Sequence, residues 1–266
     1  MTTEAAGMQT ATDLGGQTDD DPTAVMRCLR NPKENTMQHT HQAESNTRIP
    51  AVQHHASQQA QLLAGLALFA IVCKVILLAS AWLLPFVSEY SLVGDNISEL
   101  VLGRFGVIQT VAFVLSGLGT LGLAWAMYRL TRGLWGSIVG SILIGLYGIS
   151  ALIAAVFPTD RIDSPADLAN LSTTGMVHSG AALVGFICII IGMFVLTRTL
   201  MQAGWRTFAR WTALLPASAL ALLFVQGEGP LVGLLQRTLV TATSLWLLAV
   251  AFMVRNVAVA AETSTP

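Results

Sequence analysis

The stretch from Leu62 to Phe86 reads LLAGLALFAIVCKVILLASAWLLPF and contains a single charged residue, Lys74. A helix that crosses the hydrocarbon core of a bilayer needs about 20 mostly apolar residues, so this stretch is long enough to span a membrane. Five stretches of the same character follow it along the chain. They are Gly106–Tyr128, Leu134–Phe157, Gly175–Thr197, Phe208–Val225 and Leu231–Val254.

The composition agrees with a membrane protein. Hydrophobic residues make up 53% of the 266 residues and charged residues 11%, and the mean hydropathy is +0.63, whereas soluble domains are about 25% charged. None of the stretches shows the period-two alternation that is typical of transmembrane β-strands. The sequence therefore predicts an all-α, polytopic membrane protein with a six-helix transmembrane bundle.

The first 57 residues differ from the rest of the chain. They are rich in Thr, Gln, Asp, Asn and His and contain no apolar run that could form a core, so we predict a disordered polar tail over 1–57 and a membrane domain over 58–256. No basic start precedes a short apolar segment, and a signal peptide is not expected. The histidines of the tail lack further ligands at a recognisable spacing, and we predict neither a metal site nor a cofactor.

The arginines indicate the orientation of the bundle. Arg129 and Arg132 follow the second span, and Arg198 and Arg206 follow the fourth. The positive-inside rule then places both termini in the cytoplasm. We expect the protein to lie in the plasma membrane. The loops of the opposite side hold most of the acids, so we expect any ligand chemistry on this outward side. These acids are Glu89, Asp95, Glu99, Asp160, Asp163, Asp167 and Glu228.

His178 is the one histidine of the predicted membrane domain, about one turn inside the outward end of its span. It shares a helical face with the small residues Gly175, Ala182 and Gly185, so we expect it to point into the bundle rather than at lipid. A buried histidine of this kind is either a satisfied hydrogen-bonding residue or part of a functional site.

Arg237 lies about 9 Å along the sixth span from Leu231, at 1.5 Å per residue. A charge at that depth needs a partner or a water-filled pocket. One interpretation is an ion pair with an acid from the outward loops, for which Glu228, Asp160 and Glu99 are the candidates. The other is recognition of an anionic headgroup, and the two are compatible.

Lys74 is at the centre of the first span, where an uncompensated charge is costly. Its helical face carries Ala67, Ala70 and Ala81, so we expect it to face the bundle. Because no acid lies within any predicted span, its partner is expected to be a carbonyl, a hydroxyl or water.

Two segments have the spacing of a helix capping box. Asn96 and Glu99 could cap the start of the second transmembrane helix, or Glu99 could belong to a site. The segment Ser164-Pro165-Ala166-Asp167 predicts a short surface helix with proline at its first position, and no functional role is expected for Asp167.

Four motifs in order carry a resemblance to a known family. They are Asp95-Asn96-Ile97-Ser98-Glu99-Leu100, Phe157-Pro158-Thr159-Asp160, Gly175-Met176-Val177-His178-Ser179-Gly180-Ala181 and Gly233-Leu234-Leu235-Gln236-Arg237. With these motifs the chain, over about residues 60 to 255, resembles the domain-of-unknown-function-998 family of six-helix prokaryotic membrane proteins. It is more distantly similar to the Frag1-like autophagy-modulator membrane proteins. Gln236 departs from the family pattern, in which an acid is expected before the arginine.

Since the motifs end at a similar membrane depth, we predict an outward-facing polar pocket that binds a lipid headgroup or a small polar ligand. Its expected residues are Ser98, Glu99, Asp160, His178 and Arg237. A non-enzymatic binding protein is the preferred hypothesis, and a small transporter is another. An intramembrane lipid hydrolase is the enzymatic alternative, with Ser98 as nucleophile, His178 as base and Asp160 as orienting residue, although no nucleophile elbow accompanies them. No nucleotide-binding or nucleic-acid-binding pattern is present.

Overall fold

The computed structural model describes residues 45–162, 164–225 and 229–263. Within these ranges the secondary structure is helical and contains no strand, so the predicted all-α class is confirmed. The elements are α2 (Ser45–Leu83), η2 (Leu84–Val87), η3 (Ile97–Leu102), α3 (Gly106–Thr131), α4 (Ser137–Val156), α5 (Pro165–Ala169), α6 (Thr173–Gln202), α7 (Arg206–Thr212), α8 (Leu214–Val225) and α9 (Val232–Thr263).

Six helices of the described chain are long and apolar enough to cross a membrane, which confirms the predicted six spans. They are Ser57–Val87, Gly106–Thr131, Ser137–Val156, Thr173–Gln202, Arg206–Val225 and Val232–Thr263. The first helix begins at Ser45, inside the segment for which we predicted a tail, while residues 1–44 lie outside the described chain. The division at residue 57 stays a prediction.

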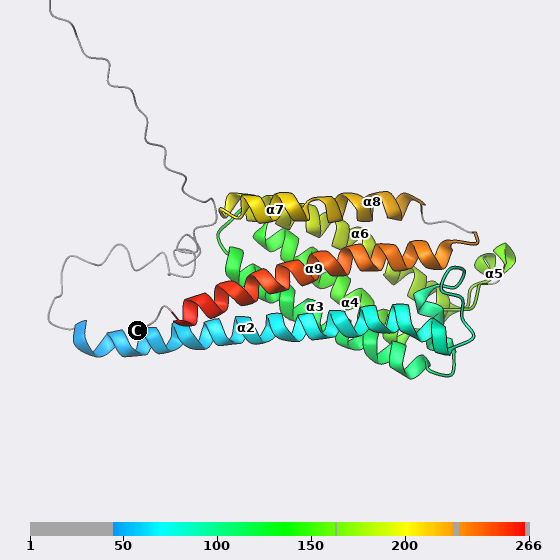
Figure 1. Cartoon of the computed structure of the whole chain (residues 1–266), viewed down its shortest axis with the longest axis horizontal. Helices are drawn as coiled ribbons and strands as arrows, with labels where there is room; N and C mark the ends of the chain where they lie inside the picture. Colours follow the sequence, from blue (N-terminus) through cyan, green and yellow to red (C-terminus); the bar gives the residue numbers. More distant parts are fainter. Residues whose placement is uncertain (1–44, 163, 226–228, 264–266) are drawn as a thin grey trace, which may run out of the picture.

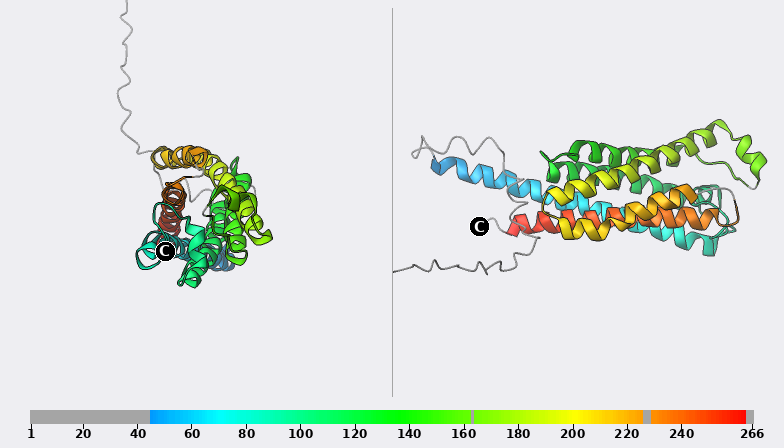
Figure 2. Two further views of the ribbon diagram at one scale, coloured as in Figure 1. Left: turned by 90° about the vertical axis from the view of Figure 1, so that its right-hand side faces the viewer. Right: turned by 90° about the horizontal axis from the view of Figure 1, so that it is seen from above.

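The spans run alongside one another as one elongated bundle (Figure 1). Helix α2 packs against α3 and α9, and α4 packs against α3 and α6. Helix α8 lies on the outside of this arrangement, against α9 and α6 (Figure 2). The start of α2 and the end of α9 lie at one end of the bundle, which we call the terminal end. The segments 88–105, 157–162 and 164–172 lie at the other end, which we call the η3 end.

The fifth span is interrupted, and its sequence explains the interruption. Helix α7 ends at Thr212 and α8 begins at Leu214. Pro216 has no N–H that could donate to the carbonyl of Thr212, four residues earlier, and its ring disfavours a continuous helix. The span is therefore built from two helical pieces.

Small residues allow the closest helix contacts, as the sequence indicated. A Cβ atom on Gly117 of α3 would lie 2.8 Å from the carbonyl oxygen of Gly148 of α4, and one on Gly140 would lie 2.6 Å from the Leu196 side chain of α6. A side chain on Gly185 would collide with Ser150. Interfaces between helices in lipid depend on such packing, because lipid tails are as apolar as the side chains they replace.

The predicted short helix after Ser164 is present as α5, with Pro165 at its first position. The Ser164 hydroxyl donates to the Asp167 carboxylate over 2.8 Å, so the two ends of the predicted capping box meet through their side chains.

Candidate functional site

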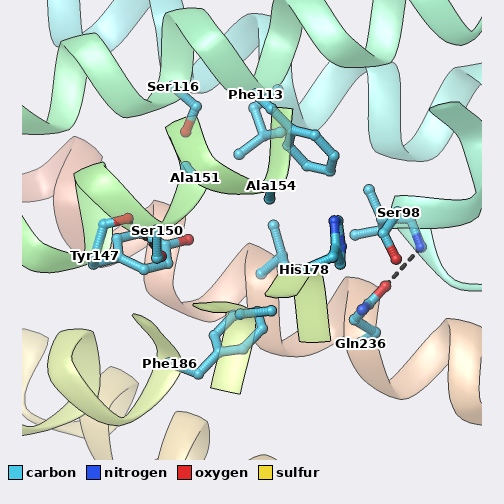
Figure 3. Close-up of a pocket in the computed structure, with 14 residues that line it drawn as sticks. Ser98, Phe113, Ser116, Tyr147, Ser150, Ala151, Ala154, His178, Phe186 and Gln236 are labelled. Carbon is cyan, nitrogen blue, oxygen red and sulfur yellow. Dashed lines mark hydrogen bonds between the residues drawn. The ribbon is translucent and has the colours of Figure 1, made fainter. Parts of the chain in front are cut away.

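A cavity lies inside the bundle, between α2, α3, α4, α6, α9 and η3 (Figure 3). Its volume is about 70 Å³, several times the ~10–15 Å³ that one water occupies in the same measure. Most of the lining is apolar, and its polar residues come from five different elements, η3, α3, α4, α6 and α9. The polar residues are Ser98, Ser116, Tyr147, Ser150, His178 and Gln236.

The second and third of the four family motifs, 157–160 and 175–181, join the α4–α6 connection to α6. The carboxylate of Asp160 accepts hydrogen bonds from the backbone N–H (2.6 Å) and the hydroxyl (2.8 Å) of Ser172. Ser172 is the N-cap of α6, and its hydroxyl oxygen accepts from the Gly175 N–H. A Cβ atom on Gly175 would collide with the Asp160 carboxylate. Asp160 therefore holds the start of α6, and Gly175 makes the close approach possible.

The other two motifs join the segment before η3 to the start of α9. The side-chain oxygen of Gln236 accepts from the backbone N–H of Ile97 over 2.6 Å, and the N–H of Leu234 donates to the Val93 carbonyl over 3.0 Å. A Cβ atom on Gly233 would collide with the Asp95 carbonyl oxygen. Two motifs that are far apart in the sequence are thus bound to each other through backbone atoms.

His178 links the second and third motifs to the cavity. Its Nδ1 donates to the carbonyl oxygen of Phe157 over 2.8 Å. Since a carbonyl only accepts, this contact requires the proton on Nδ1 and leaves the Nε2 of the neutral ring as an acceptor. The ring is 4% exposed and lines the cavity. His178 is therefore both a satisfied packing residue and a source of one free acceptor.

Gln236 and Ser98 contribute at the same end of the cavity (Figure 3). Because the Oε1 of Gln236 is held by Ile97, its amide N–H groups remain as donors. The Ser98 hydroxyl has the capacity both to donate and to accept. This end of the cavity, which we call the Gln236 end, offers donors and an acceptor but no formal charge among its described lining residues.

Arg237 is completely buried and does not line the cavity. Its Nε donates to the Ala81 carbonyl over 3.0 Å and its Nη1 to the Asp95 carbonyl over 2.6 Å, while its Nη2 has no partner among the described residues. The predicted direct partner was an acid. The hydrogen bonds instead go to two backbone carbonyls, and the carboxylates of Asp95 and Glu99 interact with the charge from nearby. Of the three predicted candidates only Glu99 is one of these two acids: Asp160 instead accepts from Ser172, and Glu228 lies outside the described residues.

Glu99 has the capping role that the sequence allowed, but on a different helix. Its Oε1 accepts from the backbone N–H (3.3 Å) and the side-chain amide (3.0 Å) of Asn96, the N-cap of η3. The second transmembrane helix begins later, at Gly106. Burial raises the pKa of the Glu99 carboxyl, and the hydrogen bonds from Asn96 partly offset that rise.

Lys74 faces the bundle as expected, and its partner is one of the three predicted kinds. It is 1% exposed, and its Nζ donates to the hydroxyl of Ser116 on α3 over 2.6 Å. The same nitrogen lies 5.2 Å from the centre of the Tyr147 ring. Ser116 and Tyr147 both line the cavity, so Lys74 stands directly behind its wall.

Of the five residues predicted to form the pocket, Ser98 and His178 line the cavity. Glu99, Asp160 and Arg237 lie around it and hold the segments that carry the lining residues. Gln236, Ser116 and the phenylalanines of the lining, Phe113 and Phe186, were not among the predicted pocket residues. The signal that could have indicated Ser116 is Lys74 itself, since a buried lysine requires a polar group on a neighbouring helix.

A family model described as "Protein of unknown function (DUF998)" matches residues 62–253. The chain belongs to this family. The resemblance carried by the four motifs is thereby confirmed. The comparisons with curated proteins and with solved structures gave no match. In this member of the DUF998 family the four motifs are the segments that interlock around the η3 end of the bundle.

We predict that Arg237→Ala lowers the melting temperature and the folded yield in detergent far more than Arg198→Ala. The substitution leaves the carbonyls of Ala81 and Asp95 without donors, at about 1–3 kcal/mol for each buried group. Arg198 is exposed and is the matched control. Equal melting temperatures for the two variants would contradict the structural role of Arg237.

Glu99 should give stability a pH dependence. Because its folded-state pKa is raised, the folded state binds this proton more tightly than the unfolded state. The contribution of Glu99 to stability is therefore fully present below the ordinary value of 4.5 and is lost as pH rises through the raised value. Thermal unfolding measured from pH 4 upward should show a smaller decline for Glu99→Gln than for the unmodified chain. Glu89→Gln, at an exposed position, controls for the loss of one charge.

Proposed function

We propose that this multi-pass membrane protein is a non-enzymatic binding protein that takes a lipid headgroup or a small polar ligand into the cavity of the bundle. The observation that carries the proposal is the Gln236 end, where free hydrogen-bonding groups of Ser98, His178 and Gln236 meet. Buried polar groups are normally paired, so three such groups from three elements around one cavity favour a polar ligand.

The chemistry of these groups suits a hydroxyl or an amide better than a bare ion. The Gln236 amide donates, the His178 Nε2 accepts and the Ser98 hydroxyl does either. A ligand group that both donates and accepts would satisfy all three. The remaining predicted residues Glu99, Asp160 and Arg237 support this end through the hydrogen bonds that hold η3, α6 and α9.

A lipid hydrolase is the second candidate, because Ser98 and the free Nε2 of His178 line the same end of the cavity. A serine and a histidine can act as nucleophile and base. The orienting group of His178, however, is the Phe157 carbonyl, while the Asp160 carboxylate accepts from Ser172. The carboxylate of the predicted triad is thus bound elsewhere, which favours binding over hydrolysis.

The orientation that we propose places both termini in the cytoplasm, with the protein in the plasma membrane. Arg129 and Arg132 lie at the α3–α4 connection and Arg206 at the α6–α7 connection, and both connections are at the terminal end (Figure 1). The described acids Asp95, Glu99 and Asp160 lie in segments of the η3 end. The positive-inside rule then supports an outward-facing η3 end.

Ligand binding should be visible as stabilisation of the purified protein. A ligand at 100 times its Kd stabilises the folded state by about 2.7 kcal/mol. We expect a thermal-shift screen of phospholipids and small polar molecules to give at least one stabilising compound, and His178→Ala to abolish its effect. Ser179→Ala, next in the chain and not part of the lining, should keep it. A compound that stabilises both His178→Ala and Gln236→Leu as well as the unmodified chain would place binding elsewhere.

Cysteine labelling of intact cells tests the orientation. In a chain without its native cysteines, Glu89→Cys at the η3 end should react with a membrane-impermeant maleimide, and Arg132→Cys at the terminal end should react only after the cells are opened. Both positions are exposed. Labelling of position 132 from outside would reverse the proposed topology.

A further inference from the structure

The cavity has a second polar region, away from the Gln236 end. Figure 3 shows Ser116, Tyr147 and Ser150 on one side of the space and Ser98, His178 and Gln236 on the other. Ser116 comes from α3, and Tyr147 and Ser150 come from α4. We call this region the Ser116 end. Its chemistry differs from that of the Gln236 end because a lysine stands behind it.

Lys74 lacks an acidic partner among the described residues. Among the described residues its hydrogen bond is the 2.6 Å contact to the Ser116 hydroxyl, and its nitrogen also lies 5.2 Å from the centre of the Tyr147 ring. An ammonium group has three N–H donors. Lys74 uses one of them toward the described residues, although its side chain is 1% exposed and lies in the middle of a span. A counter-charge from outside the chain would relieve the cost of its burial.

The Ser116 hydroxyl can pass this charge on to a ligand. Since Lys74 donates to its oxygen, the hydrogen of Ser116 is free for an acceptor in the cavity. The neighbouring Ser150 hydroxyl is different, because it donates to the Tyr147 carbonyl over 2.8 Å. The Ser116 end therefore presents a hydroxyl donor that is polarised by the Lys74 amino group, which suits an anionic oxygen.

The size and walls of the cavity limit what can fill it. A volume of about 70 Å³ corresponds to about five to seven waters. Between the two polar ends the walls are apolar, with Phe113 and Phe186 on different sides of the space (Figure 3). The small side chains of Ala151 and Ala154 of α4 also line this apolar part of the cavity. These dimensions exclude an entire phospholipid and fit a small, flat molecule.

We infer that the ligand is a small aromatic or alicyclic carboxylic acid of the benzoate type. Its carboxylate accepts from Ser116 and offsets the charge of Lys74, and its ring lies beside Phe113 and Phe186. A hydroxyl at the far side of the ring reaches the Gln236 end, where it donates to His178 and accepts from Gln236. This inference rests on the proposed binding function and specifies its ligand.

The test compares matched pairs of ligands on the full-length protein in detergent. Benzoate and benzamide have nearly the same shape, and only benzoate is charged. We expect equilibrium dialysis and thermal shift to show that benzoate binds at least about tenfold more tightly than benzamide, as for a charge-assisted hydrogen bond. Lys74→Met should bring this ratio close to one. Ser116→Ala is the second variant, in case Lys74→Met does not fold, and should also reduce the ratio. Ser179→Ala should leave the ratio unchanged.

The hydroxyl is tested separately. 4-Hydroxybenzoate should bind more tightly than benzoate, and His178→Ala should remove that advantage while keeping the preference for benzoate over benzamide. Equal binding of benzoate and benzamide to the unmodified chain would overturn the inference, as would a ratio that neither Lys74→Met nor Ser116→Ala changes. If phosphatidylglycerol vesicles stabilise the protein through His178 and benzoate does not, the inference fails and the proposed function stands. If no compound acts through His178, both fail.

Discussion

The burial of Arg237 is the constraint on which the η3 end of the bundle depends. A guanidinium buried inside a membrane protein is costly unless its N–H groups find acceptors. Here the Nε and Nη1 of Arg237 donate to the backbone carbonyls of Ala81 in α2 and Asp95 before η3, and its Nη2 has no partner among the described residues. Backbone acceptors cannot move without moving their helix or loop. The charge therefore sets the position of α9 relative to α2 and to the segment that leads into η3. The neighbouring Gln236 adds a second contact to the same segment.

The same arrangement explains why the family motifs lie where they do. Asp160 and Ser172 hold the connection before α6, and the Phe157 carbonyl accepts a hydrogen bond from His178. The third motif thus binds the backbone of the second through His178, and the fourth binds the backbone of the first through Gln236 and Arg237. The Gln236 end of the cavity lies where these two pairs meet. A polar residue near a cavity can therefore shape it without lining it, as Arg237 does.

Much of the fold could be predicted because it follows from the length of the apolar spans and from the residues that share a helical face. The six helices, the inward-facing His178 and the buried Lys74 with a hydroxyl partner all follow from these local rules. The lining of the cavity does not, because it depends on which helices are neighbours. Ser116 is an ordinary small residue in sequence, and it becomes the hydrogen-bond partner of Lys74 only because α3 packs against α2. Glu99 caps η3 rather than the second transmembrane helix, and this could not be predicted because the 3₁₀ helix between α2 and α3 has no periodic pattern of its own.

The contact between Lys74 and Ser116 also bears on how the chain enters the membrane. During synthesis the first span leaves the ribosome before α3 exists, so its lysine meets lipid or the translocon without its hydroxyl partner. On insertion scales that charge costs about 2.5–3.5 kcal/mol, while each Leu, Ile, Val or Phe returns about 0.3–0.6 kcal/mol. The first stretch contains enough such residues to insert on its own. The lysine then favours one neighbouring helix over others, because only a helix that brings a polar group to mid-membrane depth lowers the cost of burying its amine. One buried amine thus favours α3 over a purely apolar helix as the first partner of α2.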